Sequence, residues 1–168
     1  GGASTGSATS TIFVSPAITT RYYIRGEGLC NTTFCMSISI SVNDTSISAT
    51  SITAINDSLC TGDSTILGIT GGVLGTGADW YWYTVTCGGT FEGMGATITV
   101  TPTATTDYYV RAEGVANTTG CANITITLNT LSVLPTGIVA TKDTINIGET
   151  DTLAISGGTL GTQAMWTW

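Results

Sequence analysis

The sequence repeats itself with a period of 86 residues, and this repeat restricts the possible folds more than any other feature. Residues 1–82 align with residues 87–168 without a gap and share 35 identical positions. The stretch IFVSPAITTRYYIRGEG (12–28), for example, matches ITVTPTATTDYYVRAEG (98–114). A fixed period of this kind indicates one structural unit used in series. Any fold assigned to one copy must therefore suit the other.

Apolar and polar side chains alternate in both copies, and this alternation predicts β-strands. Leu67 and Ile69 recur as Leu153 and Ile155, so both copies keep the same inward face. The same alternation runs through DYYVRAEG and NITITL, with Gly-Gly, Pro and Asn-Thr-Thr turn signals between the segments. Val, Ile, Thr and Tyr dominate the alternating segments, so the sequence predicts an all-β chain.

The stretch DWYWY (79–83) contains four aromatic side chains in a row, and its copy MWTW (165–168) separates their roles. Both tryptophans recur in the copy, whereas the tyrosine between them becomes threonine. Residues two apart in a strand share a face, so the tryptophans occupy one face and Tyr81 and Tyr83 the other. Because tryptophan buries a large apolar area, we expect the tryptophan face to pack in the core. The alternative is a sugar-binding platform that uses the two tyrosines. The expected core aromatic residues are Trp80, Trp82, Tyr108, Trp166 and Trp168.

The order of the predicted strands resembles that of an immunoglobulin-like sandwich. A strand that carries Leu67 leads to a strand that carries Trp80, and the later stretch TATTDYY is similar to a tyrosine corner. The usual cysteine pair between the second and sixth strands is missing, and Leu67 and Val110 stand near those positions. The predicted fold class is all-β, with tandem immunoglobulin-like β-sandwiches.

The repeat also predicts the domain organisation. One complete domain is expected over residues 46–130. Residues 1–45 would supply the C-terminal strands of a domain whose start is absent, and residues 131–168 the N-terminal strands of a further domain. The two partial domains are complementary and together would make one more domain. Because the chain opens with Gly1-Gly2 and stops within a predicted strand, we expect an interior piece or a mature subunit of something larger.

Composition argues against several classes of function. Only 9% of the residues are charged, Lys and Arg total 4, and the net charge is −7, so no basic patch is available for nucleic acid or an anionic membrane. Histidine is absent, which removes the commonest general base and metal ligand. No apolar run reaches the roughly 18 residues that suggest a membrane-spanning helix. We therefore expect no catalytic residue, cofactor or metal site, and no enzyme.

Several motifs, taken together, resemble one family. The combination of W-x-W-Y, C-G-G-T, I-x-V-x-P, YYVRAEG and N-T-T-x-C is similar to the tandem immunoglobulin-like repeats of large secreted surface proteins of Bacteroidetes-type bacteria. Those proteins often end in a gliding-motility-associated sorting domain. The resemblance covers essentially the whole chain and implies a stalk, an adhesin or a spacer at the cell surface. The copies differ at Ala116, where the first has Cys30, and at Asn146, where the first has Cys60.

Five cysteines in a weakly charged, secreted-looking chain predict disulfide bonds with one thiol left over. The expected strand order places Cys60 and Cys87 at one end of the sandwich. Cys30 and Cys35 flank a predicted hairpin turn at the other end. These positions predict the pairs Cys60–Cys87 and Cys30–Cys35, with Cys121 as a free thiol. The rival pair, Cys87–Cys121, would leave three cysteines unexplained.

The acidic side chains are expected at the surface. Arg25 with Glu27, and Arg111 with Glu113, lie two apart on an outward strand face and predict solvated ion pairs. Calcium binding by Asp57, Asp63, Asp143 and Asp151, around the turn into the second strand of each copy, is the competing interpretation, but no dense D-x-D-x-D loop is present there.

Hydroxyl and amide side chains provide glycosylation candidates. The family resemblance implies O-linked sugars at Asp-Ser/Thr-apolar sequences, and N-x-Ser/Thr sequons add further candidates. Sugars would help to keep a β-rich chain with a mean hydropathy of +0.33 from pairing edge to edge. The candidates are Ser58, Ser64, Thr144, Thr152, Asn31 and Asn117.

These observations lead to one expectation about function and one alternative. We expect a structural repeat unit of an extracellular filament or long surface adhesin, which assembles end to end through immunoglobulin-like domains. Its partners would be copies of itself or neighbouring repeats of one long chain. The alternative is a secreted module that binds carbohydrate or another surface.

Overall fold

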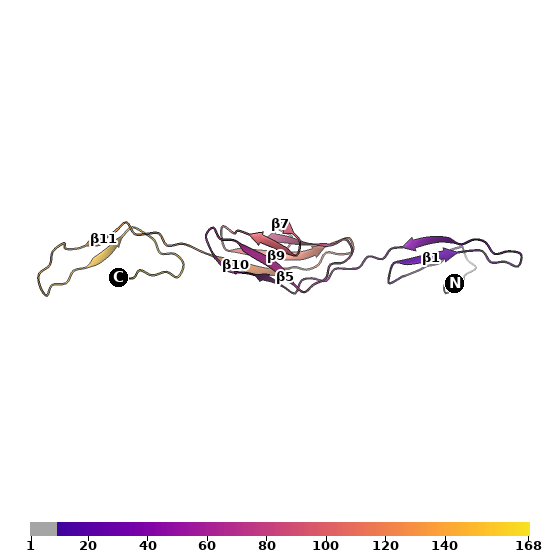
Figure 1. The fold of residues 1–168 in the computed structure, drawn as a ribbon, viewed down its shortest axis with the longest axis horizontal. Helices are drawn as coiled ribbons and strands as arrows, with labels where there is room; N and C mark the ends of the chain where they lie inside the picture. The colour runs from indigo at the N-terminus through magenta and orange to yellow at the C-terminus, as the bar shows by residue number, and fades with distance from the viewer. Residues whose placement is uncertain (1–9) are drawn as a thin grey trace.

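The computed structural model describes residues 10–168, which form strands and turns only. Figure 1 shows three groups of strands in a row, with the N-terminal and C-terminal groups on opposite sides of a larger central group. Strand pairing stays inside each group. Within residues 10–168 there is no helix long and apolar enough to cross a membrane.

The central group is a sandwich of two sheets. One sheet has five strands in the order β4-β10-β9-β6-β7, and the other has three in the order β3-β5-β8. The pair β4–β10 is parallel, and all other pairs in these sheets are antiparallel. The strands are β3 (Ser51–Ala54), β4 (Ser58–Cys60), β5 (Thr65–Thr70), β6 (Asp79–Thr84), β7 (Thr90–Met94), β8 (Thr97–Val100), β9 (Thr106–Glu113) and β10 (Ala122–Asn129).

Alternating side chains from both sheets meet in one core. The largest fully buried side chains are those of Leu67, Trp82, Val110 and Ile126. Leu67 comes from the three-stranded sheet and the other three from the five-stranded sheet, so the core joins the two layers. Burying each such side chain stabilises the fold by about 1.5–3 kcal/mol relative to leaving it exposed. Leu67 and Val110 thus fill the space that a disulfide occupies in other sandwiches of this type.

The turn between β5 and β6 requires glycine. Gly71 and Gly72 have φ angles of +70° and +76°, which residues with a Cβ adopt rarely. A Cβ on Gly72 would lie only 2.7 Å from the Trp80 ring. The Trp80 ring therefore packs on glycine backbone, and the neighbouring Trp82 donates its Nε1 hydrogen bond to the Gly95 carbonyl at 2.8 Å.

The two outer groups are antiparallel hairpins that match parts of the central sandwich. β1 (Thr20–Ile24) pairs with β2 (Met36–Ile40), and β11 (Gly137–Ala140) pairs with β12 (Leu153–Ser156). After a shift of 86 residues, β1 and β2 fall on β9 and β10, and β11 and β12 fall on β3 and β5. One hairpin thus belongs to the five-stranded sheet of its repeat and the other to the three-stranded sheet.

Candidate assembly interface

The outer hairpins expose side chains whose repeat equivalents are buried in the central sandwich. Ile24 on β1 is 70% exposed, whereas its equivalent Val110 on β9 is 0% exposed. Leu153 on β12 is 53% exposed, whereas Leu67 on β5 is 0% exposed. The same apolar positions therefore lack a cover in both outer hairpins. Contiguous apolar faces of this kind mark interaction sites.

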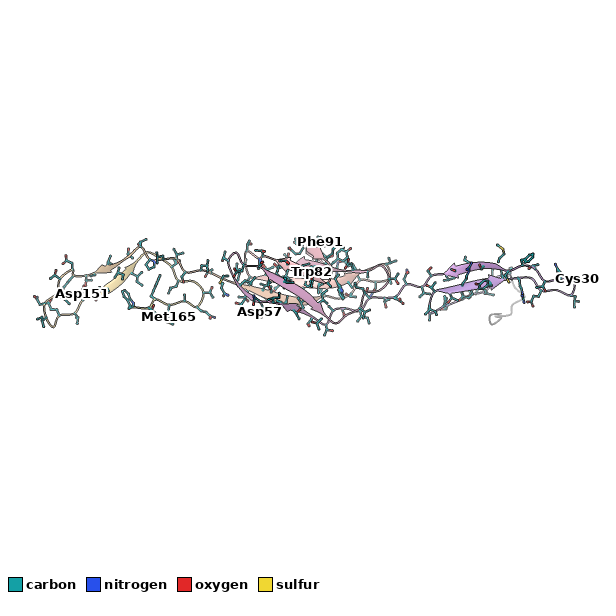
Figure 2. All side chains as sticks on the ribbon, viewed as in Figure 1. Cys30, Asp57, Trp82, Phe91, Asp151 and Met165 are labelled. Carbon is teal, nitrogen blue, oxygen red and sulfur yellow. A yellow bond between two sulfur atoms is a disulfide. The ribbon has the colours of Figure 1, made fainter. Side chains whose placement is uncertain are left out.

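The expectation that Trp166 and Trp168 lie in the core is wrong for this structure. Trp168 is 72% exposed, in contrast to 0% for its equivalent Trp82, and Trp166 is half-buried. Trp82 is enclosed because β6 lies between β7 and β9, where it pairs with Val110. Residues 166–168 form no strand and have no such neighbours; Met165 marks this stretch in Figure 2.

A set of hydrogen bonds fixes the entry of the chain into the central sandwich. Thr76 donates its backbone N–H to the Asp44 carbonyl at 3.0 Å, and its Oγ1 accepts from the Asp44 N–H at 3.0 Å. The Ser46 hydroxyl accepts from the backbone N–H of Gly75 at 2.9 Å. These bonds hold the segment that leaves the N-terminal hairpin against the β5–β6 turn.

The same bonds recur at the exit from the central sandwich, 86 residues later. Thr162 donates to the Thr130 carbonyl at 3.1 Å and accepts from the Thr130 N–H at 2.9 Å. The Ser132 hydroxyl accepts from the Gly161 N–H at 3.0 Å. Both connections of the central sandwich are therefore built in the same way, as expected for repeats in series.

One further contact completes the first connection and, among residues 10–168, has no counterpart at the second. The Asn117 side chain accepts from the Ser46 N–H at 2.7 Å and donates to the Ser46 carbonyl at 2.9 Å. Asn117 closes the turn between β9 and β10, where its carbonyl accepts from Gly114. Its equivalent, Asn31, closes the matching turn of the N-terminal hairpin, where it accepts from Gly28 at 2.9 Å. Asn31 is exposed at the tip of this hairpin.

This contact affects the glycosylation candidates. The Asn117 amide nitrogen, where an N-linked sugar would attach, is already bonded to the Ser46 carbonyl. The folded sandwich therefore disfavours modification at Asn117, whereas Asn31 is exposed. Ser58, Ser64, Thr144 and Thr152 are also exposed, although the Ser58 hydroxyl accepts a hydrogen bond from Asn129 at 2.8 Å.

The disulfide bond of the structure differs from the expected pairs. Cys87 is bonded to Cys121, with a Cα–Cα distance of 5.9 Å, so the expectations of a Cys60–Cys87 pair and a free Cys121 are wrong. Cys60 pairs with Asn129 at the end of β10, and Asn129 is eight residues after Cys121 in the sequence. At about 3.3 Å per residue, this separation is about 26 Å. A disulfide needs Cα atoms within about 7 Å, so Cys60 cannot reach Cys87.

The loop after β6 explains why Cys87 lies so far from Cys60. Val85 has a φ angle of 72°, which is uncommon for a β-branched residue and turns the chain out of the strand. The loop then crosses the outer face of the sheet, where a Cβ on Gly88 would lie 2.7 Å from the Arg111 guanidinium. Cys87 is thereby carried over β9 to Cys121 at the start of β10.

Cys30 and Cys35 are both free and exposed, so the expected Cys30–Cys35 pair is also wrong for this structure. The Gly28–Asn31 hydrogen bond holds Cys30 at the tip of a tight turn. Cys35 lies beyond this turn, directly before β2. Cys60 is the third free and exposed cysteine of the part of the chain that the structure describes.

Side chains of β9 cover part of the tyrosine platform that the sugar-binding alternative would use. Tyr83 is buried, its hydroxyl donates to the Glu113 carboxylate, and the Arg111 guanidinium lies 5.0 Å from its ring centroid. Burial, followed by the bond to Glu113, raises the pKa of Tyr83. The Tyr83 ring is therefore not available to stack on a sugar. Tyr81 remains half-buried, with its ring centroid 6.1 Å from that of Phe91.

Both expected ion pairs form. Arg25 lies 2.5 Å from Glu27, and Arg111 lies 2.8 Å from Glu113. The first pair is exposed, and such pairs contribute about 0–1 kcal/mol. Among residues 10–168, no group of three or more His, Cys, Asp or Glu side chains is placed to hold a metal ion.

The strand order, the two packed sheets and the buried Trp80 define an immunoglobulin-like β-sandwich, which confirms the prediction of an all-β, immunoglobulin-like fold. A profile of the family described as "Ig-like domain CHU_C associated" matches residues 48–135, more than half of the chain, and the chain belongs to this family. CHU_C is the gliding- and sorting-associated C-terminal region of Bacteroidetes proteins, so the family resemblance found in the sequence is confirmed. Domains of this family belong to secreted or surface proteins of these bacteria. A comparison with curated proteins found no match.

Proposed function

We propose that the chain is a structural repeat unit of an extracellular filament or long surface adhesin. In this unit, immunoglobulin-like sandwiches follow one another along an axis. The C-terminal segment of one copy combines with the N-terminal hairpin of the next copy, or of the neighbouring repeat of a longer chain, to form one more sandwich. The work of the protein is mechanical, and sugars on its exposed hydroxyl side chains would keep it soluble.

The observation that carries this proposal is the difference in exposure between equivalent positions. Ile24, Leu153 and Trp168 are mostly exposed, and the equivalents of all three are fully buried. The central sandwich also supplies the register of the new one. Since Trp82 pairs with Val110, Trp168 would pair with Ile24 of the next copy. Since Leu67 pairs with Ile98, Leu153 would pair with Ile12.

Energetics favour this assembly over isolated hairpins. A two-stranded hairpin is marginally stable in water, and each outer segment has little more than that. Covering the three side chains named above would contribute about 1.5–3 kcal/mol each before the entropy of association is subtracted. The repeated bonds at both connections would keep successive sandwiches in the same relation to one another.

The test compares two acidic substitutions of isoleucine in the 168-residue chain. Ile24→Asp places a carboxylate in the expected core of the assembled sandwich, and assembly should be lost. Ile66→Asp changes an exposed position of β5 where the repeat carries threonine, and assembly should persist. Sedimentation velocity and negative-stain electron microscopy report the length of the assemblies for the parent chain and both variants.

Intrinsic fluorescence gives an independent signal in the same samples. Burial of Trp168 on assembly should shift tryptophan emission to shorter wavelengths as the concentration rises. A parent chain that remains monomeric at high concentration, with unshifted emission, would contradict assembly between copies. Equal assembly by the Ile24→Asp variant would contradict the proposed register.

The carbohydrate-binding alternative has less support from the geometry. Because Tyr83 is buried and bonded to Glu113, the platform would consist of Tyr81 with the exposed Phe91 beside it. A glycan array on the parent chain and on a Tyr81→Ala variant distinguishes the alternatives. Binding that disappears in the variant would favour the surface-binding module.

A further inference from the structure

We propose that Cys60 of one copy forms a disulfide bond with Cys30 of the next copy, across the connection between successive sandwiches. This inference rests on the proposed function, because only the assembled sandwich brings the two residues to the same place. It assigns a covalent link to two thiols that are free and exposed in the single chain.

Cys60 lies at the C-terminal end of the central sandwich. It is the last residue of β4 and is level with Asn129, the last residue of β10. Thr130, which follows Asn129 in the chain, already belongs to the second connection, where it is hydrogen-bonded to Thr162. An exposed thiol therefore stands directly beside the point where the next sandwich begins.

Cys30 lies at the opposite end of the chain, at the tip of the N-terminal hairpin. Figure 2 shows it at the far end of this hairpin, away from the central sandwich. Its repeat equivalent, Ala116, is exposed in the β9–β10 turn, next to the Asn117 that holds Ser46. This turn thus sits at the entry of a sandwich, against the segment that arrives from the preceding one.

The repeat predicts where Cys30 goes in the assembled sandwich. Asn117 holds Ser46, so Asn31 of the next copy would hold Ser132 by the same two hydrogen bonds. Ser132 is three residues from Asn129, which corresponds to at most about 10 Å of chain. Cys30 directly precedes Asn31 in the sequence, and Cys60 is the strand partner of Asn129. The side chains of this turn and of β4 therefore converge on one short stretch of backbone.

The first connection, at the entry to the central sandwich, offers a comparison within the same sequence. Where one sandwich would present Cys60, the other presents Asn146; where one turn presents Cys30, the other presents Ala116. Each connection of the assembly therefore has either both cysteines or neither. A cysteine that served only its own sandwich would have no reason to appear and disappear together with one in the adjoining sandwich.

Cys35 is excluded as the partner by its position. It is the repeat equivalent of Cys121, which lies beside the outer face of the sheet and not in the turn. Gly1 stands where the repeat has Cys87, so Cys35 lacks the partner that Cys121 has. Cys35 stands directly before β2, five residues along the chain from the tip that carries Cys30.

The chemistry is thiol–disulfide exchange and needs a disulfide oxidant, either a small-molecule disulfide or a protein of the dithiol-oxidase class. The Cys30 thiolate attacks one sulfur of the oxidant, and the other sulfur leaves as a thiolate. The Cys60 thiolate then attacks the Cys30 sulfur and displaces the second half of the oxidant. Both cysteines lose a proton, two electrons pass to the oxidant, and the oxidant leaves as two thiols.

The experiment uses equal amounts of unlabelled and ¹⁵N-labelled chain, mixed as monomers and assembled in oxidised glutathione. After alkylation, cleavage with Glu-C and Asp-N divides the cysteines among four peptides. These are 57–62 with Cys60, 28–43 with both Cys30 and Cys35, 79–92 with Cys87, and 114–142 with Cys121. Linkage of 57–62 to 28–43, with light–heavy hybrids making up about half of the linked peptide, is the expected result. Fragment ions assign the link to Cys30.

Three variants complete the test. Cys60→Ser and Cys30→Ser should each abolish the ladder of linked chains on a non-reducing gel, and Cys35→Ser should keep it. Assemblies seen by microscopy without any linked 57–62 peptide would overturn the disulfide and leave the proposed function in place. A link from Cys60 to Cys35 would overturn the assignment of Cys30. A parent chain that forms no assemblies would overturn the proposed function and this inference with it.

Discussion

The strands of the two outer hairpins are repeat equivalents of strands in the central sandwich, yet only the central sandwich buries their apolar side chains. β1 and β2 keep the register of β9 and β10: Tyr22 faces Ile38 just as Tyr108 faces Ile124. Tyr108 is nevertheless buried and Tyr22 only half-buried. Backbone pairing is local and survives in the hairpin. Burial depends on strands elsewhere in the repeat, and a single copy of the chain does not bring those strands to its outer hairpins.

This difference separates two sources of order. The short turn and the ladder hydrogen bonds specify the hairpin, but an isolated hairpin has little free energy to spare. The sandwich gains its stability when a second sheet covers the apolar face. The outer hairpins are therefore expected to become as stable as the central sandwich only when a partner covers them.

The largest effect is expected for the two equivalent tryptophans. Trp82→Ala should lower the free energy of unfolding of the central sandwich by about 3–5 kcal/mol, because it leaves a cavity among fully buried side chains. Trp168→Ala should leave that free energy unchanged, since the side chain is mostly exposed in the single chain. Urea unfolding of monomeric samples, followed by far-UV circular dichroism, measures both.

The pair becomes more informative under assembling conditions. Trp168→Ala should then shorten the assemblies, because Trp168 takes the role of Trp82 in the new sandwich. A Trp168→Ala variant that destabilises the monomer as much as Trp82→Ala does would show that the single chain already buries Trp168. In that case the comparison between the two regions would fail.

The next largest effect is expected for the equivalent cysteines. Cys121→Ser removes a disulfide that spans 34 residues and should lower the stability of the central sandwich by about 3–4 kcal/mol. Cys35→Ser changes the matching residue of the N-terminal hairpin, which is free, and should have no measurable effect on that stability. Urea midpoints in non-reducing buffer measure both. Addition of a reductant should lower the midpoint of the parent chain to that of Cys121→Ser.

The sequence was sufficient for the features that depend on local alternation and on the repeat. The inward faces of β5 and β9 follow from side chains that recur every second residue, and Trp80 and Trp82 are buried as expected. The strand order follows from the turn signals and from the position of tryptophan. The division into residues 1–45, 46–130 and 131–168 comes from the same repeat and stays a prediction.

Two features that the sequence did not indicate, the Cys87–Cys121 bond and the cover over Tyr83, depend on the loop after β6. Val85 leaves β6 with a positive φ angle, which a β-branched residue gives no reason to expect. The loop that follows carries Cys87 away from Cys60 to Cys121, and its Gly88 lies against the Arg111 guanidinium that covers the Tyr83 ring. Alternation correctly placed Tyr83 on the outer face, but it could not show that the chain folds back over that face. The two glycines of C-G-G-T were the available signal. Any side chain at position 88 would clash with the Arg111 guanidinium, so glycine at this position is consistent with a loop packed closely against the sheet.

The smallest effect concerns the two equivalent glutamates. The hydrogen bond from Tyr83, together with those from Arg111, holds the pKa of Glu113 below its ordinary value of 4.5. Glu27 has a similar arginine but no counterpart to the buried Tyr83 in the single chain. Glu113→Gln should therefore lower the stability of the central sandwich at neutral pH by about 1.5–3 kcal/mol, the range for hydrogen bonds to a charged group. Glu27→Gln should leave it unchanged.

The pH dependence of this pair gives a stricter test than the size of the effect. A carboxyl group whose pKa is lower in the folded state contributes its full stabilisation above the unfolded value of about 4.3 and loses it as the pH falls through the folded value. The difference in unfolding free energy between the parent chain and Glu113→Gln should therefore be constant from pH 7 to about pH 5 and narrow below about pH 4. Tyr83→Phe removes the first donor and raises the folded-state pKa of Glu113, so the narrowing should be smaller and should be complete at a higher pH. A difference that stays constant down to pH 3 would mean that Glu113 acts through packing alone, and the buried Tyr83 would then not distinguish the central sandwich from the hairpin.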